Sequence, residues 1–211
     1  MNTTIIADFG SCHLGKIDTA KELIKIAADS GVDIVKGQLF RDLPNNIELP
    51  YEWVLELKGH ADDIGIELMF SVFDLEAYEM ATAHCRSIKF AYSHRNDSLI
   101  HSAIINMADV YVTSGIMDDI NPATTNLWTH THNGVPVYPV VTDINFTGTF
   151  ERFDGFSSHC LDWGQNVEAV SYGAKVIECH FCQGVEPVPD AKFAYKPKDL
   201  GNMVREIRLV E

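Results

Sequence analysis

Short apolar runs that alternate with amphipathic segments constrain the fold of this chain more than any other feature. Eight runs are typical of buried β-strands, at residues 4–9, 33–38, 66–72, 87–91, 110–114, 135–141, 155–158 and 175–181. Segments with helical periodicity lie between most of them, at residues 18–30, 51–64, 74–84, 98–107, 165–172 and 197–210. Eight strands that alternate with helices predict an α/β fold of the (β/α)8 TIM-barrel class.

The length of the chain limits how complete such a barrel can be. The chain has 211 residues, whereas barrels of this class typically run to about 250. Residues 118–132 leave room for a short helix and residues 142–154 for none, so we expect a compact barrel with shortened or missing helices after strands 5 and 6. An open doubly wound sheet is the competing architecture, but the sequence after the first strand lacks the glycine-rich phosphate loop usual there. With 46% hydrophobic residues the chain can bury one core, and we expect a single domain over residues 1–211.

The net charge and the cysteine content limit the partners and the cellular location that we expect for this chain. A formal net charge of -14 without a basic stretch excludes nucleic acid as a partner. Small anionic substrates remain possible, because a site depends on its local lysines. The first residues enter a strand at once, so we expect no signal peptide, and no apolar run reaches the length of a membrane span. Five irregularly spaced cysteines favour reduced thiols and a cytoplasmic location.

Polar residues at the ends of the predicted strands mark a candidate active site. In a TIM barrel alternate strand residues point inward, and reactive residues gather at the carboxyl ends of the strands. This rule selects Asp8, Lys36, Gln38, Ser71, Lys89, Thr113, Ser157, His159, Glu178 and His180. Each of them alone can be an ordinary rim residue. Because unpaired burial of polar groups is costly, the whole set indicates function.

Two histidines suggest a metal. His159 and His180 each follow a short apolar run, and Glu178 stands two residues before the second. Imidazoles from neighbouring strands, with a carboxylate close by, suit a divalent ion in a cleft. A zinc site that adds Cys182 is the alternative.

The sequence allows more than one role for two lysines and for one histidine in a loop. Lys36 and Lys89 would converge over the barrel mouth, where a lysine can bind a phosphate or carboxylate or form a Schiff base. The alternative is an ion pair with Asp8 or Glu178. His13 lies in the loop after the first strand, from which it either reaches substrate or stays in solvent.

Taken in order, several short motifs resemble the N-acetylneuraminate (sialic acid) synthase family. The motifs are residues 5–10 with His13 and Gly15, residues 35–38, 49–53, 73–77, 114–115, 157–159, 173–181, 189–190 and 197–200. The resemblance spans nearly the whole chain and is weak at residues 95–107 and 118–153. It covers the family's barrel domain only, without the C-terminal antifreeze-like domain.

The resemblance implies an enzyme and assigns roles by position. It implies a transferase that condenses phosphoenolpyruvate with an aldose or acylamino-aldose, usually N-acetylmannosamine, into an ulosonic acid and phosphate. His159 and His180 match metal ligands, with Mn²⁺ expected and Mg²⁺, Co²⁺ or Zn²⁺ as alternatives. The positions that match phosphoenolpyruvate ligands are Lys36, Ser71, Lys89, Thr113 and Ser157. The positions around the sugar and the reacting carbons are Asp8, Gln38, Glu178 and Asp190, of which Asp8 and Glu178 are candidates for proton transfer. A homodimer is also expected.

Departures from the family pattern keep two other hypotheses open. Asp8 stands where the family usually has Glu, and Ala191 stands where His is expected. Tyr92 occupies the place of a small phosphate-binding serine, and its bulk could obstruct an anion. The alternatives are a divergent metal-dependent lyase or isomerase on the same barrel, and a non-catalytic barrel that binds a sugar phosphate or a metal.

Overall fold

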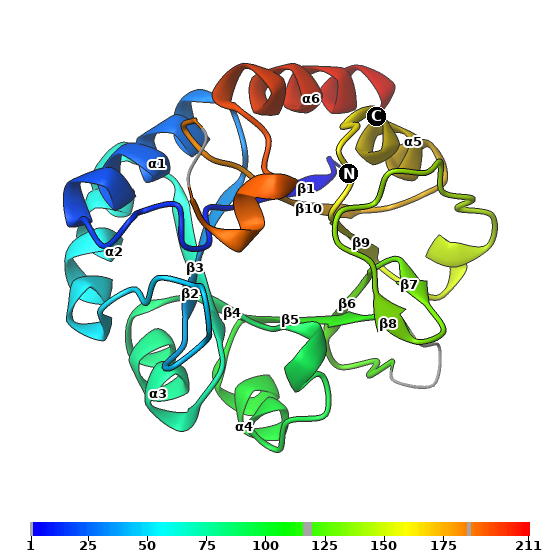
Figure 1. The fold of residues 1–211 in the computed structure, drawn as a ribbon. Helices are drawn as coiled ribbons and strands as arrows, with labels where there is room; N and C mark the ends of the chain where they lie inside the picture. The colour runs from blue at the N-terminus through cyan, green and yellow to red at the C-terminus, as the bar shows by residue number, and fades with distance from the viewer. Residues whose placement is uncertain (1, 116–119, 185–186) are drawn as a thin grey trace.

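Eight parallel strands close into a ring in the computed structural model, which describes residues 2–115, 120–184 and 187–211. The order around the ring is β1-β10-β9-β6-β5-β4-β3-β2, so the first and last strands are neighbours (Figure 1). The strands are β1 (Thr4–Asp8), β2 (Ile34–Leu39), β3 (Glu67–Val72), β4 (Ser87–Phe90), β5 (Asp109–Ser114), β6 (Thr125–Trp128), β9 (Gly155–Ser158) and β10 (Val176–His180). The predicted (β/α)8 barrel is confirmed.

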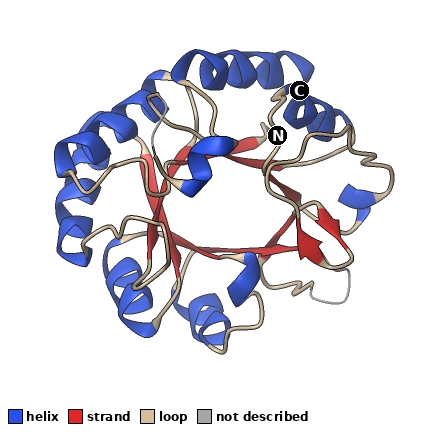
Figure 2. Cartoon of the chain, viewed as in Figure 1, coloured by secondary structure: helices blue, strands red, loops and turns tan. Residues whose placement is uncertain are grey.

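Helices surround most of the ring but leave one side open (Figure 2). The α-helices are α1 (Ile17–Asp29), α2 (Val54–Ile64), α3 (Leu75–His84), α4 (Leu99–Asn106), α5 (Gly164–Ser171) and α6 (Pro197–Val210). Short 3-10 helices are η1 (Tyr51–Trp53), η2 (Tyr92–His94), η4 (Thr149–Glu151) and η5 (Pro189–Lys192). Within the described residues no α-helix follows β5 or β6, as expected. Residues 118 and 119 of the segment predicted to hold a short helix lie outside the described residues.

The predicted sixth strand at residues 135–141 is wrong. The sixth strand of the ring is β6, where Tyr111 of β5 pairs with Thr125 and Leu127 pairs with Gly155 of β9. Residues 135–141 contain Pro136 and Pro139, which lack the N–H that an interior strand must donate. They instead contribute to a hairpin of β7 (Thr131–His132) and β8 (Val135–Pro136), followed by a cis Tyr138–Pro139 bond.

Aromatic side chains cover the part of the ring that lacks helices. Trp128 of β6 stacks on Phe156 of β9, with ring centroids 5.6 Å apart. Phe146, from the loop before η4, packs against Phe156 at 5.2 Å and against Phe150 at 5.6 Å. Aromatic rings bury large areas. This cluster of a few residues therefore covers the strands where no α-helix packs.

The strand parity divides the barrel interior into two levels. The lower level is an apolar cluster of Ile6, Ile34, Met69, Tyr111, Leu127 and Val176. Two residues further along the same strands, the inward positions are polar, and they include Asp8, Lys36, Ser71, Thr113 and Glu178. The larger apolar core lies between the strands and the helices. The interior is therefore sealed below and charged above.

Two expectations drawn from composition can be compared with the structure. No described helix is long and apolar enough to cross a membrane. All five cysteines are buried, and within the described part of the chain none of them forms a disulfide. The expected homodimer and cytoplasmic location stay predictions.

Gly155 provides a test of how the ring closes at β9. A Cβ at this position would lie 2.3 Å from the carbonyl oxygen of Val176 and 2.6 Å from its Cβ. We expect Gly155→Ala to lower the free energy of unfolding by about 3 kcal/mol, because overpacking here displaces backbone. Urea unfolding measures this change.

Gly59 provides the matched control. It is exposed in the middle of α2, and a Cβ there would meet nothing within 4 Å. We expect Gly59→Ala to raise the free energy of unfolding by about 0.5–1 kcal/mol, because alanine favours helix. Equal effects of the two substitutions would contradict the packing argument.

Candidate active site

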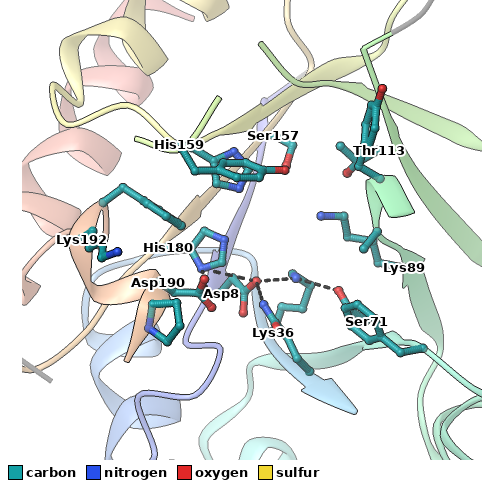
Figure 3. Close-up of a pocket in the computed structure, with 17 residues that line it drawn as sticks. Asp8, Lys36, Ser71, Lys89, Thr113, Ser157, His159, His180, Asp190 and Lys192 are labelled. Atoms are coloured by element: carbon teal, nitrogen blue, oxygen red, sulfur yellow. Dashed lines mark hydrogen bonds and ion pairs between the residues drawn. The ribbon is translucent and has the colours of Figure 1, made fainter. Parts of the chain in front are cut away.

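A cavity of about 290 Å³ opens where the strands end, at the carboxyl side of the barrel. It is lined by strand residues together with Tyr138, which follows β8, and residues of η5 (Figure 3). The predicted residues in its wall are Asp8, Lys36, Gln38, Ser71, Lys89, Thr113, Ser157, His159, His180 and Asp190. Strand parity selected nine of these residues, and the family resemblance alone suggested the tenth, Asp190 of η5.

Lys36 is the centre of a buried hydrogen-bond network. Its Nζ donates to Asp8 Oδ2 at 2.5 Å and to Ser71 Oγ at 2.8 Å. The Nε2 group of Gln38 donates to the same Asp8 oxygen at 2.8 Å. Burial disfavours the charge on Lys36, but Asp8 and Glu178 outweigh it and raise the pKa of this lysine. Burial likewise opposes the charge on Asp8, yet Lys36 lowers the pKa of that carboxyl.

Glu178 joins the two lysines. Its Oε1 lies 3.0 Å from Lys36 Nζ and accepts a hydrogen bond of 2.7 Å from Lys89 Nζ. Burial works against its charge, but the two lysines hold the pKa of Glu178 well below its ordinary value. Glu178 is buried beneath the cavity rather than in its wall. The ion pairs that the sequence left as an alternative role for the lysines are thus present.

Lys89 differs from Lys36 in its proton affinity. Burial lowers the pKa of Lys89, Glu178 raises it in part, and the charge of Lys36 lowers it again, to about 8. A carboxylate shared by two lysines cannot stabilise both ammonium groups as fully as two separate partners would. Lys89 is therefore the lysine of the pair that loses its proton first, near pH 8.

The two predicted metal ligands lie next to each other. The ring centroids of His159 and His180 are 5.3 Å apart, and Phe193 packs edge-on against each ring at 5.0 Å. Tyr138 covers His159, with ring centroids 4.1 Å apart. Burial, and then the neighbouring His180, lower the pKa of His159 well below its ordinary value. Neutral imidazoles are the form that binds metals.

The donor atoms around His180 fit a divalent ion. Its Nδ1 atom is buried and has no hydrogen-bond partner among the described residues; it lies 3.6 Å from Asp8 Oδ2 and 3.8 Å from Asp190 Oδ2. Two imidazoles and nearby carboxylates match the preferences of Mn²⁺ and similar ions. No group of three or more His, Cys, Asp or Glu side chains in the described residues already has the spacing of a metal site. Cys182, the third ligand of the alternative zinc site, lies outside the cavity wall, and its thiol donates to the Gly184 carbonyl at 3.0 Å. That alternative stays a prediction.

Asp190 reaches the site because position 10 is a glycine. A Cβ at Gly10 would lie 2.5 Å from Asp190 Oδ2, and the residue has a φ of +46°. The amide of Gly10 also donates to Asp8 Oδ1 at 2.8 Å. Burial raises the pKa of Asp190, and the nearby His180 offsets only part of that rise. Gly10 therefore leaves room for Asp190 of η5 and binds Asp8 of β1, and both carboxylates lie near His180.

The structure places His13 outside the cavity wall. It is fully buried, packs edge-on against Phe9 and Trp53, and accepts a hydrogen bond of 3.1 Å at Nδ1 from the amide of Gly15. Burial lowers its pKa to about 4. His13 therefore lies in neither of the two positions that the sequence suggested, since it neither reaches the cavity nor stands in solvent.

Several cavity residues escape sequence reasoning. Tyr138, Lys192 and Phe193 line the wall, yet they belong to loops that strand parity does not cover. The only available signal was the proximity of Lys192 and Phe193 to the Pro189–Asp190 motif. Tyr92 also lines the wall, but its hydroxyl donates to the Gly134 carbonyl of the β7–β8 hairpin at 2.7 Å.

A closed barrel with a charged cavity at the carboxyl ends of its strands is the architecture of a (β/α)8 enzyme. The model of the NeuB family matches residues 40–211. The chain therefore belongs to the NeuB family, and the resemblance seen in its motifs is confirmed.

Relatives and solved structures agree with this assignment. The chain is 27% identical to the spore coat polysaccharide biosynthesis protein SpsE of Bacillus subtilis, over 98% of this chain and 67% of that protein. It is 24% identical to the N-acetylneuraminate-9-phosphate synthase of Mus musculus, over 98% of this chain and 70% of that protein. The structure of a sialic acid synthetase from Leptospira borgpetersenii in complex with citrate shares the fold, with a TM-score of 0.84 and 21% identity, over 100% of this chain and 84% of that one.

The shared carboxylate generates a stability prediction. Glu178→Gln leaves two buried lysines with Asp8 as their remaining carboxylate partner, so we expect the free energy of unfolding to fall by about 3–5 kcal/mol. Urea unfolding at neutral pH measures the loss. Asp62→Asn breaks the exposed Lys58–Asp62 pair of α2 and should cost less than about 1 kcal/mol. A similar small loss for both variants would show that the buried network does not stabilise the barrel.

Proposed function

We propose that the protein condenses phosphoenolpyruvate with an aldose or acylamino-aldose of the N-acetylmannosamine type. The products are an ulosonic acid of the sialic acid kind and inorganic phosphate. The observation that carries the proposal is the arrangement of two buried lysines and three hydroxyl residues opposite a pair of imidazoles in one cavity. The family membership supports it, because relatives named as synthases of sugar acids belong to the same group.

The lysines and hydroxyls suit the first substrate. Phosphoenolpyruvate carries a carboxylate and a phosphate, and Lys36 and Lys89 supply two cations at the cavity floor. Ser71, Thr113 and Ser157 line the same cavity and can donate hydrogen bonds to these anions. The buried Thr113 hydroxyl has no partner within the described residues and is available to a ligand. These groups would fix the approach of the enol carbon to the aldehyde.

The histidine side of the cavity suits the aldehyde. His159 and His180 would hold a divalent ion, Mn²⁺ by expectation and Mg²⁺, Co²⁺ or Zn²⁺ as alternatives. When bound, such an ion polarises the aldehyde oxygen as a Lewis acid. Phe193 and Tyr138 pack against the imidazoles and would keep bulk water away from them.

The acidic residues would manage the protons. The enol carbon of phosphoenolpyruvate bonds to the aldehyde carbon, and the aldehyde oxygen takes a proton to become a hydroxyl. Water adds to the cationic C2 and gives a proton to Asp8, the candidate base that lines the cavity. Glu178, the other candidate, lies outside the wall and pairs with both lysines. The bond from C2 to the phosphate oxygen then breaks while the new C2 hydroxyl passes its proton to the departing phosphate, which releases inorganic phosphate and leaves the C2 carbonyl of the keto acid. Gln38 holds Asp8 in place, and Asp190 faces the sugar.

Phosphate release tests the proposed reaction. We expect phosphoenolpyruvate to release phosphate only when a suitable aldose and a divalent metal are both present, and EDTA to abolish the release. His159→Ala and His180→Ala should each lower kcat/KM more than about a hundredfold, since even partners one step removed from a metal commonly cost 10- to 100-fold. His101→Ala on the exposed side of α4 serves as the control and should retain activity.

The phosphate-release assay also distinguishes the condensation from the two alternative functions. A non-catalytic barrel would bind phosphoenolpyruvate in calorimetry but release no phosphate with any sugar. A lyase or isomerase on the same barrel would bind metal without needing phosphoenolpyruvate. Either outcome would refute the condensation.

Lys89 generates a prediction about pH. Its ammonium form attracts the substrate anion, and with a pKa of about 8 this charge is present below pH 8 and is lost above it. We expect kcat/KM for phosphoenolpyruvate to fall above pH 8, by up to about tenfold per pH unit. Lys89→Arg keeps its charge at every accessible pH, so its profile should lose this inflection even where its absolute rate is lower. An unchanged inflection in the variant would assign the titration to another group.

A further inference from the structure

Three lysines line the cavity, and their surroundings differ. Lys36 and Lys89 are buried, and both are within 3.0 Å of a carboxylate oxygen. Lys192 is exposed on η5, and within residues 2–115, 120–184 and 187–211 it has no ion pair and no side-chain hydrogen bond. Of the lysines in the cavity wall, Lys192 is the one whose charge is not already neutralised.

The charge balance of the cavity floor sharpens this difference. The two buried lysines face two carboxylates, Asp8 and Glu178, so these four groups together contribute no net charge. Asp190 adds a further acidic group near the histidines, 3.8 Å from His180 Nδ1, and within the described residues it forms no ion pair with Lys192. Within the described residues no carboxylate contacts the ammonium group of Lys192, so an anion at the mouth of the cavity could bind this group without displacing an ion pair.

The position of Lys192 assigns it to the side of the second substrate. It lies in the same turn as Asp190 and precedes Phe193, whose ring contacts both histidines. Figure 3 shows Lys192, Asp190 and His180 on one side of the cavity, with Lys89 and Thr113 on the opposite side. A molecule whose reacting end sits by the histidines would extend its far end toward the mouth, where Lys192 is exposed.

We propose that Lys192 is a specificity-determining residue that binds an anionic group, a phosphate or a carboxylate, at the far end of the acceptor aldose. This inference rests on the proposed function, because it takes the aldehyde end of the acceptor to lie beside the histidines. It goes further by naming the acceptor class: a charged aldose rather than a neutral one. A lysine ammonium binds either anion through charge-assisted hydrogen bonds.

Three acceptors that differ at one position test the inference and separate the two anions. These are N-acetylmannosamine, its 6-phosphate and its 6-carboxylate. In the wild-type protein with phosphoenolpyruvate and Mn²⁺, we expect one of the charged acceptors to have a kcat/KM at least about tenfold above that of the neutral sugar. The better of the two identifies the anion. Equal values for all three acceptors would overturn the inference.

Variants of Lys192 show whether this side chain makes the distinction. Lys192→Met should lower kcat/KM for the charged acceptor about tenfold, with the neutral sugar and the KM for phosphoenolpyruvate unchanged. Lys192→Arg should keep most of the preference. Lys196→Met removes the same charge from an exposed lysine outside the cavity wall and should have no effect. An equal rise in the KM for phosphoenolpyruvate would assign Lys192 to the first substrate and overturn the inference.

Calorimetry separates failure of this inference from failure of the proposed function. The three sugars are titrated into wild-type and Lys192→Met protein in the presence of phosphoenolpyruvate and Mn²⁺. Tighter binding of a charged sugar that is lost in Lys192→Met supports the inference, and it does so even if no turnover occurs and the proposed reaction fails. Turnover without any charge preference in binding refutes the role of Lys192 and leaves the proposed reaction standing.

Discussion

The site depends on the neutralisation of two lysines inside a barrel. Lys36 and Lys89 extend into an interior from which water is largely excluded, where an unpaired charge costs several kcal/mol. Asp8 and Glu178 offset that cost, and they come from β1 and β10, the first and last strands of the ring. Because β1 pairs with β2 in the register Asp8↔Lys36 and with β10 in the register Asp8↔His180, closure of the ring assembles the charges. The site exists only in the closed barrel.

The apolar lower half of the barrel supports this arrangement of buried charges. Side chains such as Ile6, Met69 and Leu127 fill the interior beneath the charges, and a larger apolar core lies outside the strands. Where α-helices are absent after β6, the rings of Trp128, Phe146 and Phe156 take over the packing. The charged level therefore lies on a buried apolar level, and its own hydrogen bonds and ion pairs connect its groups.

The cavity has two ends with different physical characters. At the floor, charges are buried, paired and shifted in pKa, which suits a ligand that must be oriented accurately. At the mouth, Tyr92 and the hairpin residue Gly134 bridge two loops, and the exposed Lys192 lies on the same side of the cavity as His180 (Figure 3). The floor consists of strand residues and the mouth of loop residues, a division common in barrels where loops vary while strands hold the chemistry.

Local periodicity in the sequence determined the barrel class, the helices and most of the inward-facing polar residues. That success has a physical reason, because alternation along a strand is a local property and Asp8, Lys36 and Ser71 could be assigned from their own neighbours. The tertiary structure decided what depends on pairing across the ring. It placed β6 at residues 125–128 instead of 135–141, buried His13 between Phe9 and Trp53, and made Glu178 the shared partner of both lysines. It also brought Tyr138 and Lys192 to the cavity from loops, because contacts between segments far apart in the chain follow from closure and register, which no local pattern encodes.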